Sequence, residues 1–137
     1  MRFPKSSGGP RQGDGRAVLF VDDDEAYRYA MTKRLAEKGL RVTAVADFND
    51  ALRFLESDAP LDVLLCDIRM PQDTPQGFSI ARMALVRRPR LRVLFITAFD
   101  LPPNDRVVDS KALSKSLGDD MIVLEVEEAC AAASHRA

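Results

Sequence analysis

The chain has 137 residues, of which 46% are apolar, so it suits one folded domain and is too apolar for a disordered chain. Twenty basic and 21 acidic residues nearly cancel, which argues against nucleic-acid binding through an excess of positive charge. The single histidine, His135, lies close to the C-terminus, so catalytic dyads and triads with a histidine base are nearly excluded. Cys66 and Cys130 lie in apolar and alanine-rich surroundings, which favours two core residues over a metal or redox site.

The N-terminal segment differs in composition from the rest of the chain. Residues 1–16 are rich in glycine, serine, proline and arginine, and predict a disordered leader before a domain at 17–133 and a tail at 134–137. The leader lacks the apolar segment of a secretory signal, and no apolar run is long enough to cross a bilayer. We therefore expect a cytoplasmic protein without a membrane contact.

Short apolar runs alternate with amphipathic segments from Ala17 onward. The runs at 17–21, 40–45, 62–66 and 92–97 each predict a strand. Three of them are continuous, as in strands covered on both faces of a parallel sheet, whereas the second alternates more and indicates a strand nearer an edge.

The segments between the strands carry apolar residues at helical spacing. Their expected buried faces are Tyr27, Ala30, Met31 and Leu35 in the first helix, closed by Gly39; Phe48, Ala51, Leu52 and Leu55 in the second; Phe78, Ala81 and Leu85 in the third; and Ile122, Val126, Ala129, Cys130 and Ala133 in the last. Strands alternating with helices of this length predict right-handed βαβ units and a doubly wound α/β sheet. The fourth connection is cramped, because only residues 98–111 precede the next plausible strand at 112–114. Pro102 and Pro103 restrict where a helix can begin, so we expect a shortened fourth helix that starts near Asn104.

Polar residues follow the predicted strands at the points where the strands end. They are Asp22, Asp23 and Asp24 after the first strand, Asp67 after the third, Thr97 after the fourth and Lys115 after the short fifth. Ligands of open parallel sheets bind at this edge. Crowded carboxylates repel one another and would gain protons unless a cation joins them. Oxygen ligands without soft partners favour Mg²⁺ or Mn²⁺ as that cation. An aspartate can attack a phosphoryl group, while a metal ion and a lysine stabilise the transferred charge. The residues therefore predict phosphoryl transfer to an aspartate.

The segments VLFVDDDE, DVLLCDIRMP, VLFITA and LSKS occur in this order and each ends a predicted strand. Together they resemble the response-regulator receiver family over residues 17–133. The resemblance implies a flavodoxin-like five-stranded sheet of order 2-1-3-4-5, with Asp67 as the phosphoacceptor. It also implies that Asp22 and Asp23 bind the metal together with Asp67 and the backbone carbonyl of Arg69.

The remaining site residues and the partners follow from the same resemblance. Thr97 and Lys115 would contact the phosphoryl group, beside the small residue Ala98. Such a domain is a signalling switch rather than an enzyme, and it catalyses only its own phosphorylation and dephosphorylation. The expected phosphodonor is a sensor histidine kinase or a histidine phosphotransfer protein. We expect a stand-alone switch or phosphate shuttle with an unknown downstream protein target, no direct DNA binding and a possible phosphorylation-dependent dimer.

Two residues depart from the family pattern. The family usually has a cis proline after its lysine, where this chain has Ser116, and often an aromatic residue three positions before it, where this chain has Ala112. A cis bond before serine is far more costly than before proline, so a trans or strained peptide is expected and the reach of Lys115 is an open question.

Several simpler or different interpretations remain open at this point. Asp24 is assigned to capping the first helix, Thr97 could be an ordinary strand residue, and Lys115 could be a solvated edge lysine. The basic run of Arg82, Arg87, Arg88, Arg90 and Arg92 is interpreted as a solvated face rather than as a partner or nucleic-acid patch. A degenerate receiver used only for protein binding is the alternative function. A haloacid-dehalogenase-type phosphohydrolase is a weaker one, and it would carry the phosphoryl group on Asp22.

Overall fold

The computed structural model describes residues 16–68, 76–98 and 111–134, and these segments form a parallel sheet of order β2-β1-β3-β4-β5. The strands are β1 (Ala17–Val21), β2 (Arg41–Val45), β3 (Val63–Asp67), β4 (Arg92–Thr97) and β5 (Lys111–Ser114). The helices are α1 (Glu25–Glu37), α2 (Phe48–Glu56), α3 (Gln76–Arg87) and α4 (Asp119–Ser134), with the short 3-10 helix η1 (Lys115–Leu117) directly after β5.

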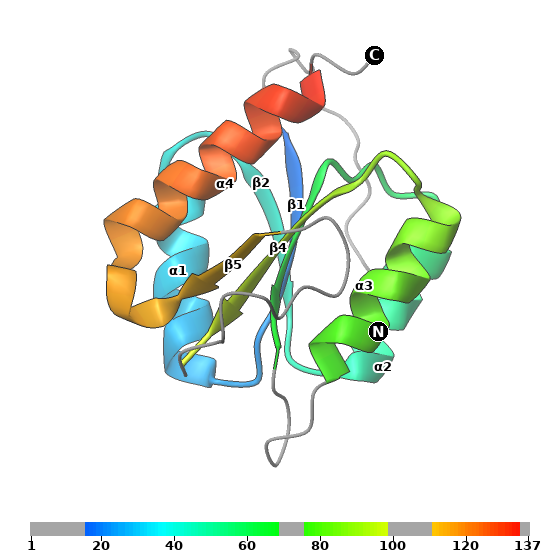
Figure 1. The fold of residues 1–137 in the computed structure, drawn as a ribbon, viewed down its shortest axis with the longest axis horizontal. Helices are drawn as coiled ribbons and strands as arrows, with labels where there is room; N and C mark the ends of the chain where they lie inside the picture. Colours follow the sequence, from blue (N-terminus) through cyan, green and yellow to red (C-terminus); the bar gives the residue numbers. More distant parts are fainter. Residues whose placement is uncertain (1–15, 69–75, 99–110, 135–137) are drawn as a thin grey trace.

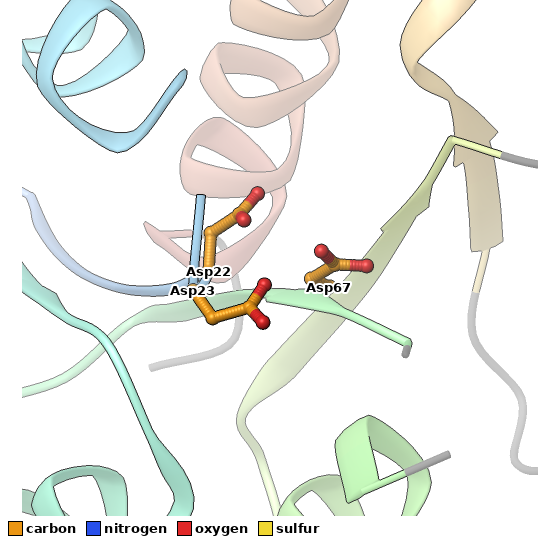
Figure 2. A group of neighbouring side chains, drawn as sticks. All are labelled: Asp22, Asp23 and Asp67. Atoms are coloured by element: carbon orange, nitrogen blue, oxygen red, sulfur yellow. The ribbon is translucent and has the colours of Figure 1, made fainter. Parts of the chain in front are cut away.

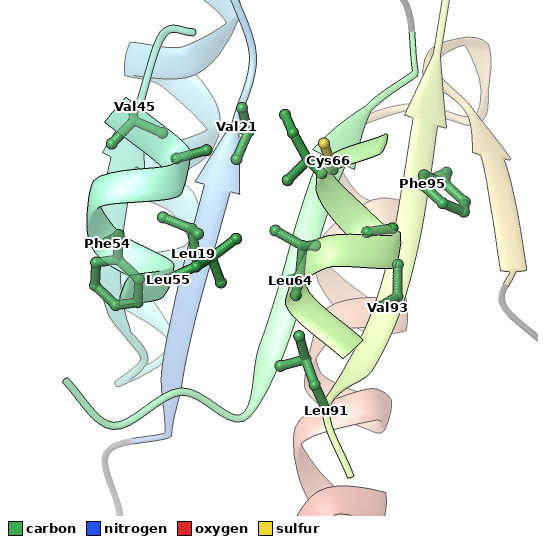
Figure 3. Close-up of a cluster of buried hydrophobic side chains, with 14 of the residues drawn as sticks. Leu19, Val21, Val45, Phe54, Leu55, Leu64, Cys66, Leu91, Val93 and Phe95 are labelled. Atoms are coloured by element: carbon green, nitrogen blue, oxygen red, sulfur yellow. The ribbon is translucent and has the colours of Figure 1, made fainter. Parts of the chain in front are cut away.

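Helices cover both faces of the sheet. Figure 1 shows α1 and α4 on one face and α2 and α3 on the other. Successive strand side chains point to opposite faces, so Leu19 and Val21 of β1 pack in the cluster under α2 and α3, whereas Val18 and Phe20 pack under α1 and α4. Figure 3 shows the first of these clusters. Burial on both faces explains why the central strands are continuous apolar runs.

The predicted fold class and strand order are confirmed. Each strand lies within one residue of its predicted bounds, and the alternating run at 40–45 contains β2, which is an edge strand. Cys66 and Cys130 are buried free thiols, as expected of core residues.

The predicted helix faces are only partly right. Ala30 is exposed, although the sequence pattern predicts it on the buried face of α1. Met31 and Leu35 are the buried residues of this helix. In α2 the buried face is centred on Ala51, Phe54 and Leu55, so it is rotated relative to the predicted one, and Phe48 and Leu52 are only half-buried. This shift arises because the rotation of a helix about its axis is set by which side chains best fill the space above the sheet. The helical period of the sequence alone does not fix that rotation.

Some expectations fall on residues outside the described segments. These are the shortened fourth helix near Asn104, most of the leader at 1–16 and most of the tail at 134–137. None of the helices in the described segments combines the length and hydrophobicity that a bilayer crossing requires.

Candidate metal-binding site at the carboxyl edge of the sheet

The carboxyl ends of β1 and β3 lie side by side at the point where strand order reverses. The chain leaves β1 toward β2 on one side, while β3 pairs with β1 on the other. Val21 pairs with Cys66, so the residues that follow each of them, Asp22 and Asp67, emerge next to one another. A crevice at such a switch point is where doubly wound sheets bind ligands.

Three carboxylates converge at this edge. Asp22, Asp23 and Asp67 each offer one oxygen, and these oxygens lie within 4.8 Å of one another. Figure 2 shows Asp22 and Asp23 following β1 and Asp67 at the end of β3. Asp22 and Asp67 are buried whereas Asp23 is exposed, so the group opens to solvent on the side of Asp23.

Backbone hydrogen bonds fix Asp22 in place. Its N–H donates to the carbonyl of Val45 at 3.1 Å, and its own carbonyl accepts from Nη1 of Arg28 at 2.8 Å. Its Oδ1 accepts from the N–H of Asp24 at 2.9 Å. Asp24 in turn caps α1, because its side chain accepts from the N–H of Tyr27 at 3.1 Å, as the sequence predicts.

Lys115 reaches the carboxylates. Its Nζ lies 2.9 Å from Oδ2 of Asp22 and 3.6 Å from Oδ2 of Asp67. Burial would lower the pKa of Lys115, but the hydrogen bond to Asp22 and the charges of Asp22, Asp67 and Asp24 outweigh it, so the pKa is raised and the ammonium stays charged. The alternative that Lys115 is a solvated edge lysine is therefore wrong. The lysine side chain is long enough to reach the carboxylates of Asp22 and Asp67.

The peptide bond between Lys115 and Ser116 is trans, since no cis bond occurs within the described segments. The trans alternative considered from the sequence is confirmed. Lys115 begins η1, and the side chain of Ser114 caps this turn. Lys115 therefore stays at the site although serine, and not proline, follows it.

Thr97 ends β4 at the same edge of the sheet. It is buried, and it pairs with Ser114 of β5 while the preceding Ile96 pairs with Asp67 of β3. This register places Thr97 beside the carboxylates, with the exposed Ala98 directly after it. Arg69, Met70 and Pro71 lie outside the described segments.

Gly77 shapes the site, although the helical pattern of the sequence did not predict this role. A Cβ at Gly77 would lie 2.2 Å from the carbonyl oxygen of Asp67 and 2.8 Å from Cα of Ile68. The Gly77 N–H donates to the carbonyl of Ile68 at 2.9 Å, so the start of α3 packs directly on the backbone of the β3 end. A glycine in the first turn of a predicted helix was the available signal for such a close approach.

Tyr27 was predicted as a core residue of α1, and its role in the site was also missed. Its ring lies beneath the ammonium of Lys115, with Nζ 4.2 Å from the ring centroid. The spacing of apolar residues along α1 cannot reveal this contact, because Lys115 directly follows β5 and is distant from α1 in the sequence.

The charge of the group suits a divalent cation. Three carboxylates and one ammonium leave a formal charge of −3 + 1 = −2. The three ligand atoms that the described residues offer are carboxylate oxygens. Mg²⁺ and Mn²⁺ prefer oxygen ligands, and Mg²⁺ commonly keeps several waters and needs only one or two protein carboxylates. Asp22, Asp23 and Asp67 therefore fit such an ion.

The family model described as the response regulator receiver domain matches residues 18–127. The chain belongs to this family of signalling domains. A curated relative, the response regulator receiver protein CpdR of Brucella abortus, is 33% identical over an alignment of 122 positions that covers 86% of this chain and 99% of that protein. The phosphohydrolase alternative thereby loses its basis.

Solved receiver structures share the fold of this receiver domain. A CheY-like receiver domain from Methanospirillum hungatei superposes with a TM-score of 0.77 at 19% identity, over 90% of this chain and all of that one. TrrA of Thermotoga maritima, solved in complex with Mg(2+)-BeF, superposes with a TM-score of 0.70 at 22% identity, over 83% of this chain and 98% of that one. Another TrrA structure is a complex with the histidine kinase ThkA. Other relatives, the DNA-binding transcriptional regulators NtrC, are matched over only 16–17% of their own length.

Proposed function

We propose that this receiver domain accepts a phosphoryl group on Asp67 with the help of Mg²⁺ or Mn²⁺. One observation carries the proposal: the Asp67 carboxylate lies at a strand end together with the carboxylates of Asp22 and Asp23 and the ammonium of Lys115. A structural aspartate would not need two further carboxylates and a lysine around it. The receiver TrrA, which shares the fold, has been solved with a metal and beryllofluoride, and this supports the same chemistry here.

Asp67 is the nucleophile of the proposed reaction. One of its carboxylate oxygens attacks phosphorus, and the new O–P bond forms as the bond to the leaving group breaks. That leaving group is the imidazole of a phosphohistidine, or acetate when acetyl phosphate is the donor. The product is an acyl phosphate on Asp67.

The neighbouring residues would balance the charge of the phosphoryl group and hold it in place beside Asp67. Asp22, Asp23 and Asp67 would hold the divalent ion, together with the backbone carbonyl of Arg69, and the ion when bound offsets the charge of the phosphoryl oxygens. Lys115 already lies within reach of Asp67 and can pair with the phosphoryl group. Thr97 ends the adjacent strand and supplies the hydroxyl that turns toward it.

The new charge on Asp67 would bias the β4–β5 edge toward a second arrangement, because Thr97 and Lys115 are drawn to it. We propose that the phosphodonor is a sensor histidine kinase or a histidine phosphotransfer protein. The existence of a TrrA–ThkA complex supports this class of partner. The domain would act in the cytoplasm on a protein target, as a signalling switch or phosphate shuttle; its phosphorylation would favour a dimer, and the domain itself would not contact DNA.

A calorimetric titration with Mg²⁺, followed by beryllofluoride, tests the proposal. Wild type should bind Mg²⁺ and then beryllofluoride. Asp67→Asn should abolish binding of beryllofluoride, and Asp23→Asn should weaken Mg²⁺ binding roughly tenfold or more. Glu56→Gln is the matched control, because Glu56 is an exposed carboxylate at the end of α2, toward the opposite edge of the sheet. A wild-type protein that gives no heat with either ligand would instead favour a degenerate receiver used for protein binding.

A further inference from the structure

The ammonium of Lys115 occupies a defined position although its side chain is long and flexible. Lysine is a point charge on a four-carbon stem, and fixing it costs much of its rotamer freedom. The Lys115 side chain is only 17% exposed and faces the fully buried Asp22. The carboxylates of Asp22 and Asp67 attract the ammonium from two sides, and a further contact would hold it at one position between them.

The aromatic ring of Tyr27 provides such a contact. Nζ of Lys115 lies 4.2 Å from the ring centroid, well inside the range of a cation–π interaction. Tyr27 follows the Asp24 cap in the first turn of α1, so the hydrogen bond from its own N–H to Asp24 fixes the backbone from which the ring projects.

The ring is held by packing rather than by its hydroxyl group. Phe20 of β1 meets it edge-on, with centroids 6.2 Å apart and the planes at 69°. The Tyr27 hydroxyl is buried and has no hydrogen-bond partner among the described residues. Burial and the charges of Asp119, Asp22, Asp67 and Asp24 raise the pKa of this phenol, so it stays neutral. The feature of Tyr27 that the site uses is therefore the ring face.

The turn that contains Lys115 is fixed from the other side. The Ser114 hydroxyl accepts from the N–H of Ser116 at 3.1 Å, and the two serine hydroxyls lie 2.7 Å apart. Ser114 pairs with Thr97 in the sheet, so the capped turn starts from a fixed strand end. The backbone of Lys115 is thus held by Ser114 and its ammonium by Tyr27.

We propose that Tyr27 is a positioning residue for Lys115: its ring holds the ammonium over Asp22 and Asp67 in a chain where serine follows the lysine. The consequence for phosphorylation rests on the proposed function, because it matters only if Lys115 pairs with a phosphoryl group on Asp67. Without the ring face, the lysine stem can swing toward solvent and the ammonium is less often in place.

A double-mutant cycle with beryllofluoride in saturating Mg²⁺ tests this coupling. Tyr27→Leu should weaken binding of the mimic roughly three- to tenfold, and Tyr27→Phe should leave it within about twofold because the ring remains. In a Lys115→Met background, the same Tyr27→Leu change should have less than about a twofold effect. Tyr29→Leu is the matched control, since Tyr29 is 73% exposed on the same helix. Equal weakening by Tyr27→Leu in both backgrounds overturns the proposal.

A spectroscopic measurement tests the contact without relying on phosphorylation. The ε-methylene protons of Lys115 should be shifted upfield by the ring current, and the signal is assigned by its loss in Lys115→Arg. Tyr27→Phe should keep the shift and Tyr27→Leu should abolish it, with Tyr27→Met as the substitute if the leucine variant does not fold. An unshifted Lys115 signal in wild type overturns the inference. A shifted signal in a protein that binds no beryllofluoride sustains the contact and overturns the proposed function instead.

Discussion

Asp22, Asp23 and Asp24 are consecutive in the chain but have three different environments. Asp22 is buried and pairs with Lys115, Asp23 is exposed beside it, and Asp24 caps α1. The sequence singled out Asp24 as the helix cap, but it did not distinguish the buried Asp22 from the exposed Asp23. The separation comes from the change between strand and helix geometry, which turns successive side chains in different directions.

The close approach of α3 to the end of β3 leaves no room for a side chain at Gly77. Gly77→Ala should lower the free energy of unfolding by about 1–3 kcal/mol, because the added methyl group would overlap backbone atoms of Asp67 and Ile68. Urea unfolding measures this, with Ser79→Ala as a control on an exposed position of the same helix. Equal stability of Gly77→Ala and wild type would contradict the close packing of α3 on the end of β3.

Sequence patterns located the acidic residues of the site but not its supporting residues. Asp22 and Asp67 were predictable because each ends a strongly apolar strand, and parallel strands end at one edge. The contacts of Gly77 and Tyr27 were not, because they depend on how closely helices approach the sheet; a glycine at the start of a helix permits such an approach without showing that it occurs. That distance is set by packing of the whole core and has no period in the sequence.

Among the elements, α3 is tied to the α2–β3 connection by Arg88. Its guanidinium donates to the carbonyls of Ala59 at 2.7 Å and Ser57 at 2.9 Å. Burial lowers the pKa of Arg88, which the charge of Asp58 opposes. The interpretation of the basic run as a solvated face is therefore wrong for Arg88, whereas Arg82, Arg87, Arg90 and Arg92 are exposed as expected. Composition could not distinguish Arg88 from its neighbours, since only its position just beyond α3 brings it to these carbonyls.

Removal of this guanidinium should loosen α2. Arg88→Ala should destabilise the protein by about 1–3 kcal/mol, because the carbonyls after α2 lose charged donors. The neighbouring exposed Arg87→Ala should change stability by less than about 0.5 kcal/mol. Thermal and urea unfolding of the two variants give the comparison, and an equal effect at both positions would show that Arg88 acts only through charge.

In the part of the chain that the structure describes, two buried clusters flank the sheet, one beneath α2 and α3 and one beneath α1 and α4. The βαβ alternation and the continuous strands made this architecture predictable. Each cluster contains one buried thiol, Cys66 in the first and Cys130 in the second. The thiols therefore report on the integrity of the two layers.

Because Cys130 is buried, the free energy of unfolding should fall at alkaline pH. Burial raises the pKa of Cys130 to about 11, and the charge of Asp62 adds to this, whereas the pKa of an unfolded cysteine is about 8.5. A raised folded pKa stabilises the protein below the unfolded pKa, and that contribution is lost as the pH rises toward the folded value. Between pH 7.5 and pH 10, wild type should therefore lose about 1–2 kcal/mol more than Cys130→Ala does in urea unfolding. Parallel losses in the two proteins would contradict a buried, protonated Cys130.

Localisation of the phosphoryl group shows whether Asp67 is the phosphoacceptor. Wild type is incubated with acetyl phosphate and Mg²⁺, the acyl phosphate is trapped by borohydride reduction, and the labelled peptide is identified by mass spectrometry. The site geometry predicts one modified residue, Asp67, and no modification in Asp67→Asn or when Mg²⁺ is chelated. A label on Asp22, or a wild-type protein that acquires none, would contradict it.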